Sequence, residues 1–183
     1  VKPRPRPFAF VASVSTVLAL TAVCACLAAV VARGAERLPN IVVIFTDDHG
    51  YGDVGVFGAK GFATPHLDRL ARDGAMLKSF YVQPVCSPTR AALLTGRYPT
   101  HTGVYGVVRP NAPWGLPLAE RTLPQALRDA GYETALVGKW HLGESDAAYR
   151  PTRRGFDHQY GLWFGNIDYF THLRDGVLDW HRN

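Results

Sequence analysis

Residues 41–46 form a short apolar run, rich in β-branched side chains, in which apolar and polar positions do not alternate. A pattern of this kind is typical of a strand that is buried on both faces of a parallel sheet. Asp47 and Asp48 follow the run directly, so the predicted strand ends in two carboxylates. We therefore expect an α/β fold in which polar groups gather at the carboxyl edge of the sheet.

The rest of the chain shows signals for helices and strands in alternation. Thr64 and Ser87 each precede a proline, which marks two helix starts, and Thr122 with Gln125 forms a capping box at a third. We expect helices over 64–74, 87–96 and 122–131, and strands over 75–82 and 132–137. This alternation predicts an open α/β sheet flanked by helices.

The first 37 residues differ in composition from the rest. Residues 8–32 carry no charge and follow three basic residues, Lys2, Arg4 and Arg6. Such a stretch is typical of an export leader, and it is also long enough to span a bilayer. We expect residues 1–37 to be a signal peptide or an uncleaved amino-terminal anchor, and residues 38–183 to form one domain. The protein is then exported to a periplasm, the cell exterior or a lysosome-like lumen, and only residues 8–32 would contact a membrane.

The excess of basic residues belongs mostly to this leader. The chain has a formal net charge of +5, from 20 basic and 15 acidic residues. Five of the basic residues and one of the acidic ones lie within residues 1–37, so the remaining domain is nearly neutral. A nucleic-acid-binding domain would need a basic surface of its own, and we therefore expect no nucleic-acid partner.

Cys86 is the one cysteine outside the leader, so the domain offers it no disulfide partner. It lies at a predicted helix start, four residues before Arg90, where the helix dipole and the guanidinium create a positive field. This position suits a reactive centre with an anionic intermediate. The alternatives are a small apolar residue at a helix entrance and an ordinary thiol nucleophile, which would need a histidine as base.

Asp47 and Asp48 are candidate metal ligands. Two adjacent carboxylates repel one another, and a cation or a proton is needed to hold both. Oxygen ligands favour calcium or magnesium over softer metals. The alternative is a solvated acidic turn, because acidic pairs are common in loops.

Lys139 and His141 alternate with Trp140 at the end of another predicted strand, so both side chains can point to the same side. A fixed cation beside an imidazole can hold an oxyanion and move a proton. The same two residue types also occur at ordinary exposed strand ends, which is the alternative interpretation.

Taken together, these segments resemble the sulfatases. Residues 86–97, Cys-Ser-Pro-Thr-Arg-Ala-Ala-Leu-Leu-Thr-Gly-Arg, are similar to the first sulfatase signature, and residues 131–143 are similar to the second. The Asp-Asp pair stands where the family has its first metal ligands. Residues 151–157 and 168–172 further resemble the arylsulfatase B branch. The resemblance implies an alkaline phosphatase/sulfatase-like α/β fold, with a mixed, mainly parallel sheet flanked by helices and incomplete in this chain.

The resemblance also implies hydrolysis of sulfate esters of phenols or sugars. In sulfatases the cysteine of the Cys-x-Pro-x-Arg core, here Cys86, is oxidised to formylglycine by a formylglycine-generating or sulfatase-maturing enzyme. One hydroxyl of the aldehyde hydrate attacks sulfur and expels the alcohol, and the other collapses to release sulfate. Arg90 would steady the hydrate, while Lys139 and His141 would hold sulfate and assist proton transfer. The implied catalytic residues are therefore Cys86, Arg90, Lys139 and His141.

A divalent metal is implied as well. Asp47, Asp48 and the formylglycine derived from Cys86 would bind it, and calcium is expected before magnesium. A divalent ion and two cationic groups around one sulfate suit the charge that develops in the transition state.

Chain length and the choice of nucleophile leave other functions open. Sulfatases are considerably longer and take further ligands, another histidine and another lysine from a later segment that has no match here. We therefore expect an amino-terminal part of the enzyme, with little or no turnover by itself. One alternative is a phosphoesterase of the alkaline phosphatase superfamily, although most such enzymes use serine or threonine. Another is an inactive, truncated sulfatase-like protein that binds sulfated glycans.

Overall fold

A computed structural model describes residues 38–183 of the chain. Contacts within it divide the chain into two units, Val1–Thr46 and Asp47–Asn183. The predicted leader and its boundary at residue 37 lie outside the described residues and stay predictions. Among the described residues, no helix combines the length and the apolar character needed to cross a bilayer.

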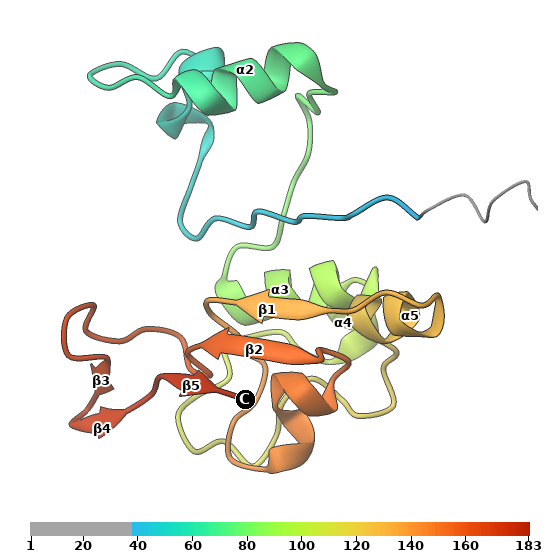
Figure 1. The fold of residues 1–183 in the computed structure, drawn as a ribbon. Helices are drawn as coiled ribbons and strands as arrows, with labels where there is room; N and C mark the ends of the chain where they lie inside the picture. Colours follow the sequence, from blue (N-terminus) through green and yellow to red (C-terminus); the bar gives the residue numbers. More distant parts are fainter. Residues whose placement is uncertain (1–37) are drawn as a thin grey trace, which may run out of the picture. The chain divides into compact units, whose positions relative to one another are not determined.

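The second unit contains the helices expected from the sequence. Three of them, α2, α3 and α5, correspond to the predicted helices at 64–74, 87–96 and 122–131 (Figure 1). The capping box at Thr122 is present, since the Gln125 amide bonds the threonine hydroxyl and the Gln125 side chain bonds the Thr122 amide. The helices of residues 38–183 are α2 Pro65–Asp73, α3 Cys86–Thr95, α4 Pro99–Thr102 and α5 Leu123–Asp129, with 3-10 turns at Tyr51–Asp53, Gly55–Phe57, Ala147–Tyr149 and Pro151–Arg153.

The described strands form a small mixed sheet and a separate hairpin. The sheet has the order β1-β2-β5, where β1 is Ala135–Val137, β2 is His158–Gly161 and β5 is His181–Arg182. Strand β1 pairs in parallel with β2, and β5 runs antiparallel to β2 (Figure 1). The hairpin consists of β3 Leu173–Arg174 and β4 Val177–Leu178. A mixed sheet with helices agrees with the predicted α/β class.

The core of this unit forms where α3 packs against the chain that follows β1. Its buried residues come from α3, from the loop after α4 and from the segment beyond the strand: Ala91, Val104, Leu116, Trp140, Leu142 and Phe156. The Trp140 ring meets Phe156 edge to face at 6.1 Å, and its indole donates to the Gly143 and Tyr149 carbonyls. Because Trp140 is anchored in this way, the residues on either side of it, Lys139 and His141, are held in fixed positions beside α3.

Two predicted strands are wrong. Residues 41–46 and 75–82 take part in no strand pairing within the described part of the chain. The side chains of Val42 and Ile44 are 82% and 78% exposed, which is the opposite of a strand buried on both faces. A β-branched run favours extended backbone, but a strand forms only where a neighbour supplies the ladder of hydrogen bonds. The third predicted strand, 132–137, is confirmed in its last three residues as β1.

Candidate active site

Helix α3 carries two of the candidate residues. Cys86 is its first residue, after Val85 in extended conformation, and Arg90 follows one turn later on the same face. The Cys86 thiol is half-buried and free of disulfide bonds among the described residues. The Thr89 hydroxyl lies 2.8 Å from the carbonyls of Gln83 and Val85, which ties the helix to the chain entering it. These contacts fix where residue 86 is presented.

The chain after β1 carries the other two candidate catalytic residues. The amides of Trp140 and His141 each donate, at 2.9 Å, to carbonyls of the segment that follows β2. His141 has a φ of 56°, in the left-handed region that costs a residue other than glycine about 1 kcal/mol or more. This turn directs the imidazole into the interior, where the residue is 5% exposed.

Asp47 joins these two segments through ion pairs. Its Oδ2 lies 2.6 Å from Lys139 Nζ and 3.3 Å from Arg90 Nη2, and Arg90 also donates to the Lys139 carbonyl. The side chains of Arg90 and Lys139 are 11% and 15% exposed. Burial raises the pKa of Asp47, but the hydrogen bond and charge of Lys139 and the charge of Arg90 outweigh this effect and leave the pKa below its ordinary value. Asp47 is therefore an anion shared by two cations.

His141 is held in one orientation. Its Nε2 lies 3.0 Å from the Val108 carbonyl, and because a carbonyl only accepts, Nε2 carries the proton. Nδ1 is buried without a hydrogen-bond partner among the described residues. Burial, followed by the charge of Lys139, lowers the pKa of His141 to about 4. The imidazole is thus neutral at neutral pH, with Nδ1 unprotonated.

Asp47 and Asp48 are the candidate ligands for a hard divalent cation. Both residues offer carboxylate oxygens, the ligands that such cations prefer. Asp48 has a φ of 50°, in the left-handed region, so the backbone turns at this residue. Residues 38–183 contain no group of three histidine, cysteine, aspartate or glutamate side chains arranged around a common point. The predicted ligation by Asp47, Asp48 and Cys86 is untested and stays a prediction.

Sequence reasoning missed two residues next to these groups. Ser87 was expected to start its helix, but α3 begins at Cys86 and Val85 is the capping residue. The Ser87 hydroxyl instead donates to the His141 carbonyl at 2.8 Å and accepts from the Val108 amide at 3.0 Å. Nothing in the sequence identifies Val108, because it lies in a loop and acts through its backbone.

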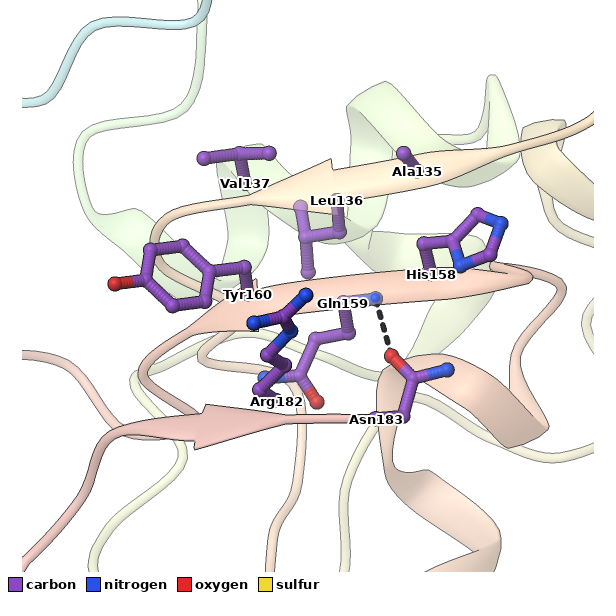
Figure 2. Close-up of a pocket in the computed structure, with 8 residues that line it drawn as sticks. All are labelled: Ala135, Leu136, Val137, His158, Gln159, Tyr160, Arg182 and Asn183. Carbon is purple, nitrogen blue, oxygen red and sulfur yellow. Dashed lines mark hydrogen bonds between the residues drawn. The ribbon is translucent and has the colours of Figure 1, made fainter.

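A hollow of about 460 Å³ lies elsewhere, on the sheet (Figure 2). Strands β1, β2 and β5 and the last residue supply its walls: Ala135, Leu136, Val137, His158, Gln159, Tyr160, Arg182 and Asn183. None of the candidate residues lines it. The candidate residues form a separate group, the site cluster, which we define as Asp47, Cys86, Arg90, Lys139 and His141.

Comparisons with known proteins identify the family of the chain. Residues 39–177 match the family model described as Sulfatase. Arylsulfatase J of Mus musculus is 46% identical over 137 residues, which cover 74% of this chain and 23% of that protein. N-acetylgalactosamine-6-sulfatase of Canis lupus familiaris is 43% identical over 144 residues, which cover 74% of this chain and 27% of that protein. The chain thus spans about a quarter of the length of the curated relatives it matches.

Solved structures show the same likeness. The crystal structure of PsFucS1 sulfatase from Pseudoalteromonas sp. superimposes with a TM-score of 0.64 at 36% identity, covering 81% of this chain and 30% of that one. The region matched by the family model contains every member of the site cluster, together with Ser87 and Val108.

Proposed function

The chain belongs to the sulfatase family, and from this premise we propose that it carries the nucleophile-bearing part of an enzyme that hydrolyses sulfate esters of phenols or sugars. The supporting observation is the site cluster, in which a half-buried thiol at a helix start lies one turn from Arg90, and Arg90 shares Asp47 with Lys139. The names of the two curated relatives, an arylsulfatase and an amino-sugar sulfatase, support both aryl and carbohydrate sulfates as candidate substrates.

Cys86 is the proposed source of the nucleophile. Oxidised to formylglycine by a maturation enzyme and hydrated, residue 86 would supply the oxygen that attacks sulfur. The Cys-x-Pro-x-Arg sequence on the first turn of α3 supports this proposal, since it presents the thiol at a helix start while burying the three residues that follow. Formylglycine-generating or sulfatase-maturing enzymes are accordingly the expected partners of the chain.

Arg90 and Lys139 are the proposed anion-binding groups. Both are mostly buried and both already bind one carboxylate oxygen, so they converge on a point where negative charge is stabilised. A sulfate ester places charged oxygens around the reacting sulfur, and fixed cations stabilise the charge that develops there. His141, neutral and with Nδ1 unprotonated, is the proposed proton acceptor.

Asp47, Asp48 and the formylglycine derived from Cys86 are the proposed ligands of a divalent cation, with calcium preferred to magnesium. When bound, such an ion polarises sulfate oxygens as a Lewis acid. Oxygen-only ligands support a hard cation. The described residues 38–183 contain no group of three histidine, cysteine, aspartate or glutamate side chains around a common point, and we expect the 183-residue chain to bind metal weakly and turn over little.

Export is the remaining proposal. A leader over residues 1–37 would deliver the protein to a periplasm, the cell exterior or a lysosome-like lumen, with retention at a membrane only through residues 8–32. Its basic residues followed by an uncharged stretch support the proposal.

The sulfate ester and the phosphate ester of one phenol, used as substrates, distinguish a sulfatase from a phosphoesterase. The protein expressed from its complete reading frame with a maturation enzyme is expected to hydrolyse the phenol sulfate in preference to the phenol phosphate. Mass spectrometry of the peptide containing residue 86 is expected to show the aldehyde. Cys86→Ala should lower kcat on the order of 10³-fold or more. Preference for the phosphate would indicate a phosphoesterase, and an unmodified thiol with retained binding to sulfated glycans would indicate an inactive binder; either result contradicts the proposal.

A further inference from the structure

Ser87 occupies a position that links three separate segments. Its side chain is fully buried, at 0% exposure. The hydroxyl donates to the His141 carbonyl, 54 residues further along the chain, and accepts from the Val108 amide, 21 residues away. A serine hydroxyl has one proton to donate and can also accept. The Ser87 hydroxyl uses its proton in the bond to His141 and accepts the bond from Val108. The first turn of α3 is thereby joined to the loop of Val108 and to the segment after β1.

Val108 completes a closed circuit of hydrogen bonds. Its amide donates to Ser87, and its carbonyl accepts from His141 Nε2 at 3.0 Å. Val108 is 2% exposed, so neither backbone group can turn to water without movement of the loop. The circuit holds the backbone of His141 through its carbonyl and the ring of His141 through its Nε2.

The other sides of the imidazole are closed by the segment that follows β2. The Phe164 ring meets it at 5.1 Å with an interplanar angle of 67°. A Cβ added at Gly165 would lie 2.6 Å from His141 Cε1, so the backbone at this position approaches the ring closely. With these sides filled, the Val108 carbonyl is the contact that decides which ring nitrogen carries the proton.

We propose that Ser87 is a positioning residue, whose hydroxyl orients the Val108 carbonyl so that His141 carries its proton on Nε2 and presents Nδ1 as the acceptor. The catalytic use of His141 rests on the proposed function, whereas the tautomer itself does not. Ser87 touches neither substrate nor reacting atoms in this scheme; it acts through Val108 and His141.

The tautomer is measured by two-bond proton-nitrogen NMR correlation on the full chain with labelled histidine, at neutral pH. The His141 signal is identified by its loss in His141→Gln. We expect the wild type and Ser87→Thr to show the pattern of a proton on Nε2, and Ser87→Ala to show a mixture of both tautomers. A proton on Nδ1 in the wild type, or an unchanged pattern in Ser87→Ala, overturns the proposal. If Ser87→Ala does not fold, Ser87→Cys takes its place, because a thiol of similar size is only a weak hydrogen-bond donor and acceptor and should likewise give a mixture of tautomers.

Kinetics on the protein from its complete reading frame test the catalytic consequence. Mass spectrometry of residue 86 in each variant gives the modified fraction, and rates are expressed per modified protein. Ser87→Ala is expected to lower kcat about 10- to 100-fold with little change in KM, because small misplacements of a catalytic group have effects of this size. Ser87→Thr retains a hydroxyl, so its kcat should stay close to that of the wild type.

Thr95→Ala is the matched control for loss of a hydroxyl. The Thr95 hydroxyl lies on the same helix and donates to the Ala91 carbonyl at 2.7 Å, one turn back. Its removal should leave kcat unchanged. Equal losses in Thr95→Ala and Ser87→Ala would show a general effect on α3 and overturn the positioning role. A modified wild type without sulfatase activity would instead contradict the proposed function, while the NMR result would still decide the tautomer.

Discussion

Acid should destabilise the protein through His141. The residue is 5% exposed, and burial, followed by the charge of Lys139, lowers its pKa from 6.5 to about 4. Between these two values the unfolded chain binds a proton that the folded chain does not, so stability rises with pH and is lost as pH falls from 6.5 towards 4. Between the two pKa values, each unit of pH changes the free energy of unfolding by about 1.4 kcal/mol. The loss attributable to His141 is therefore about 2 kcal/mol at pH 5 and about 3 kcal/mol at pH 4.

Urea unfolding followed by tryptophan fluorescence measures this loss. The free energy of unfolding of the wild type should fall between pH 7 and pH 5 by about 2 kcal/mol more than that of His141→Gln, in which the titrating group is absent. His66→Gln, which removes an exposed imidazole from α2, should behave as the wild type does. An equal fall in the wild type and His141→Gln would refute the assignment of the acid sensitivity to this residue.

Three further substitutions and one control test the core, the packing against His141 and the cap of α5. Leu116→Ala, at a position with 0% exposure, should lower the free energy of unfolding by about 2–5 kcal/mol in urea titrations. Gly165→Ala places a methyl group 2.6 Å from the His141 ring and should reduce kcat, whereas Gly106→Ala, with no atom within 4 Å of its Cβ, should not. Thr122→Ala removes the cap of α5 and should cost about 1 kcal/mol or more, measured as a shift of the urea midpoint.

The helices were predictable because their signals are local. A proline near the helix start and a terminating glycine act within a few residues, and α2, α3 and α5 lie where such signals occur. The expected side-chain cap forms at Thr122, whereas Thr64 makes no cap hydrogen bond and Ser87 lies inside α3. The membership in the sulfatase family was predictable for a related reason. Its signatures are contiguous segments whose residues need no contact with the rest of the chain to be recognised.

The strands were less predictable because a strand depends on its partner. Residues 41–46 have the composition of a buried strand, yet the described structure provides no ladder for them. Strand β1 forms because β2 pairs with it in parallel from Ala135 to Val137. Apolar, β-branched composition alone does not distinguish these two outcomes.

By itself, the sequence determined the chemistry available to the protein: a single thiol in a Cys-x-Pro-x-Arg segment, an acidic pair, and a lysine and histidine two residues apart. Only the tertiary structure decided which groups meet. It pairs Asp47 with both Lys139 and Arg90, across 92 and 43 residues, and it assigns the proton of His141 through the backbone carbonyl of Val108. The physical reason is that pKa values and tautomers depend on burial and on contacts made by backbone groups, which every residue carries and no sequence pattern reveals.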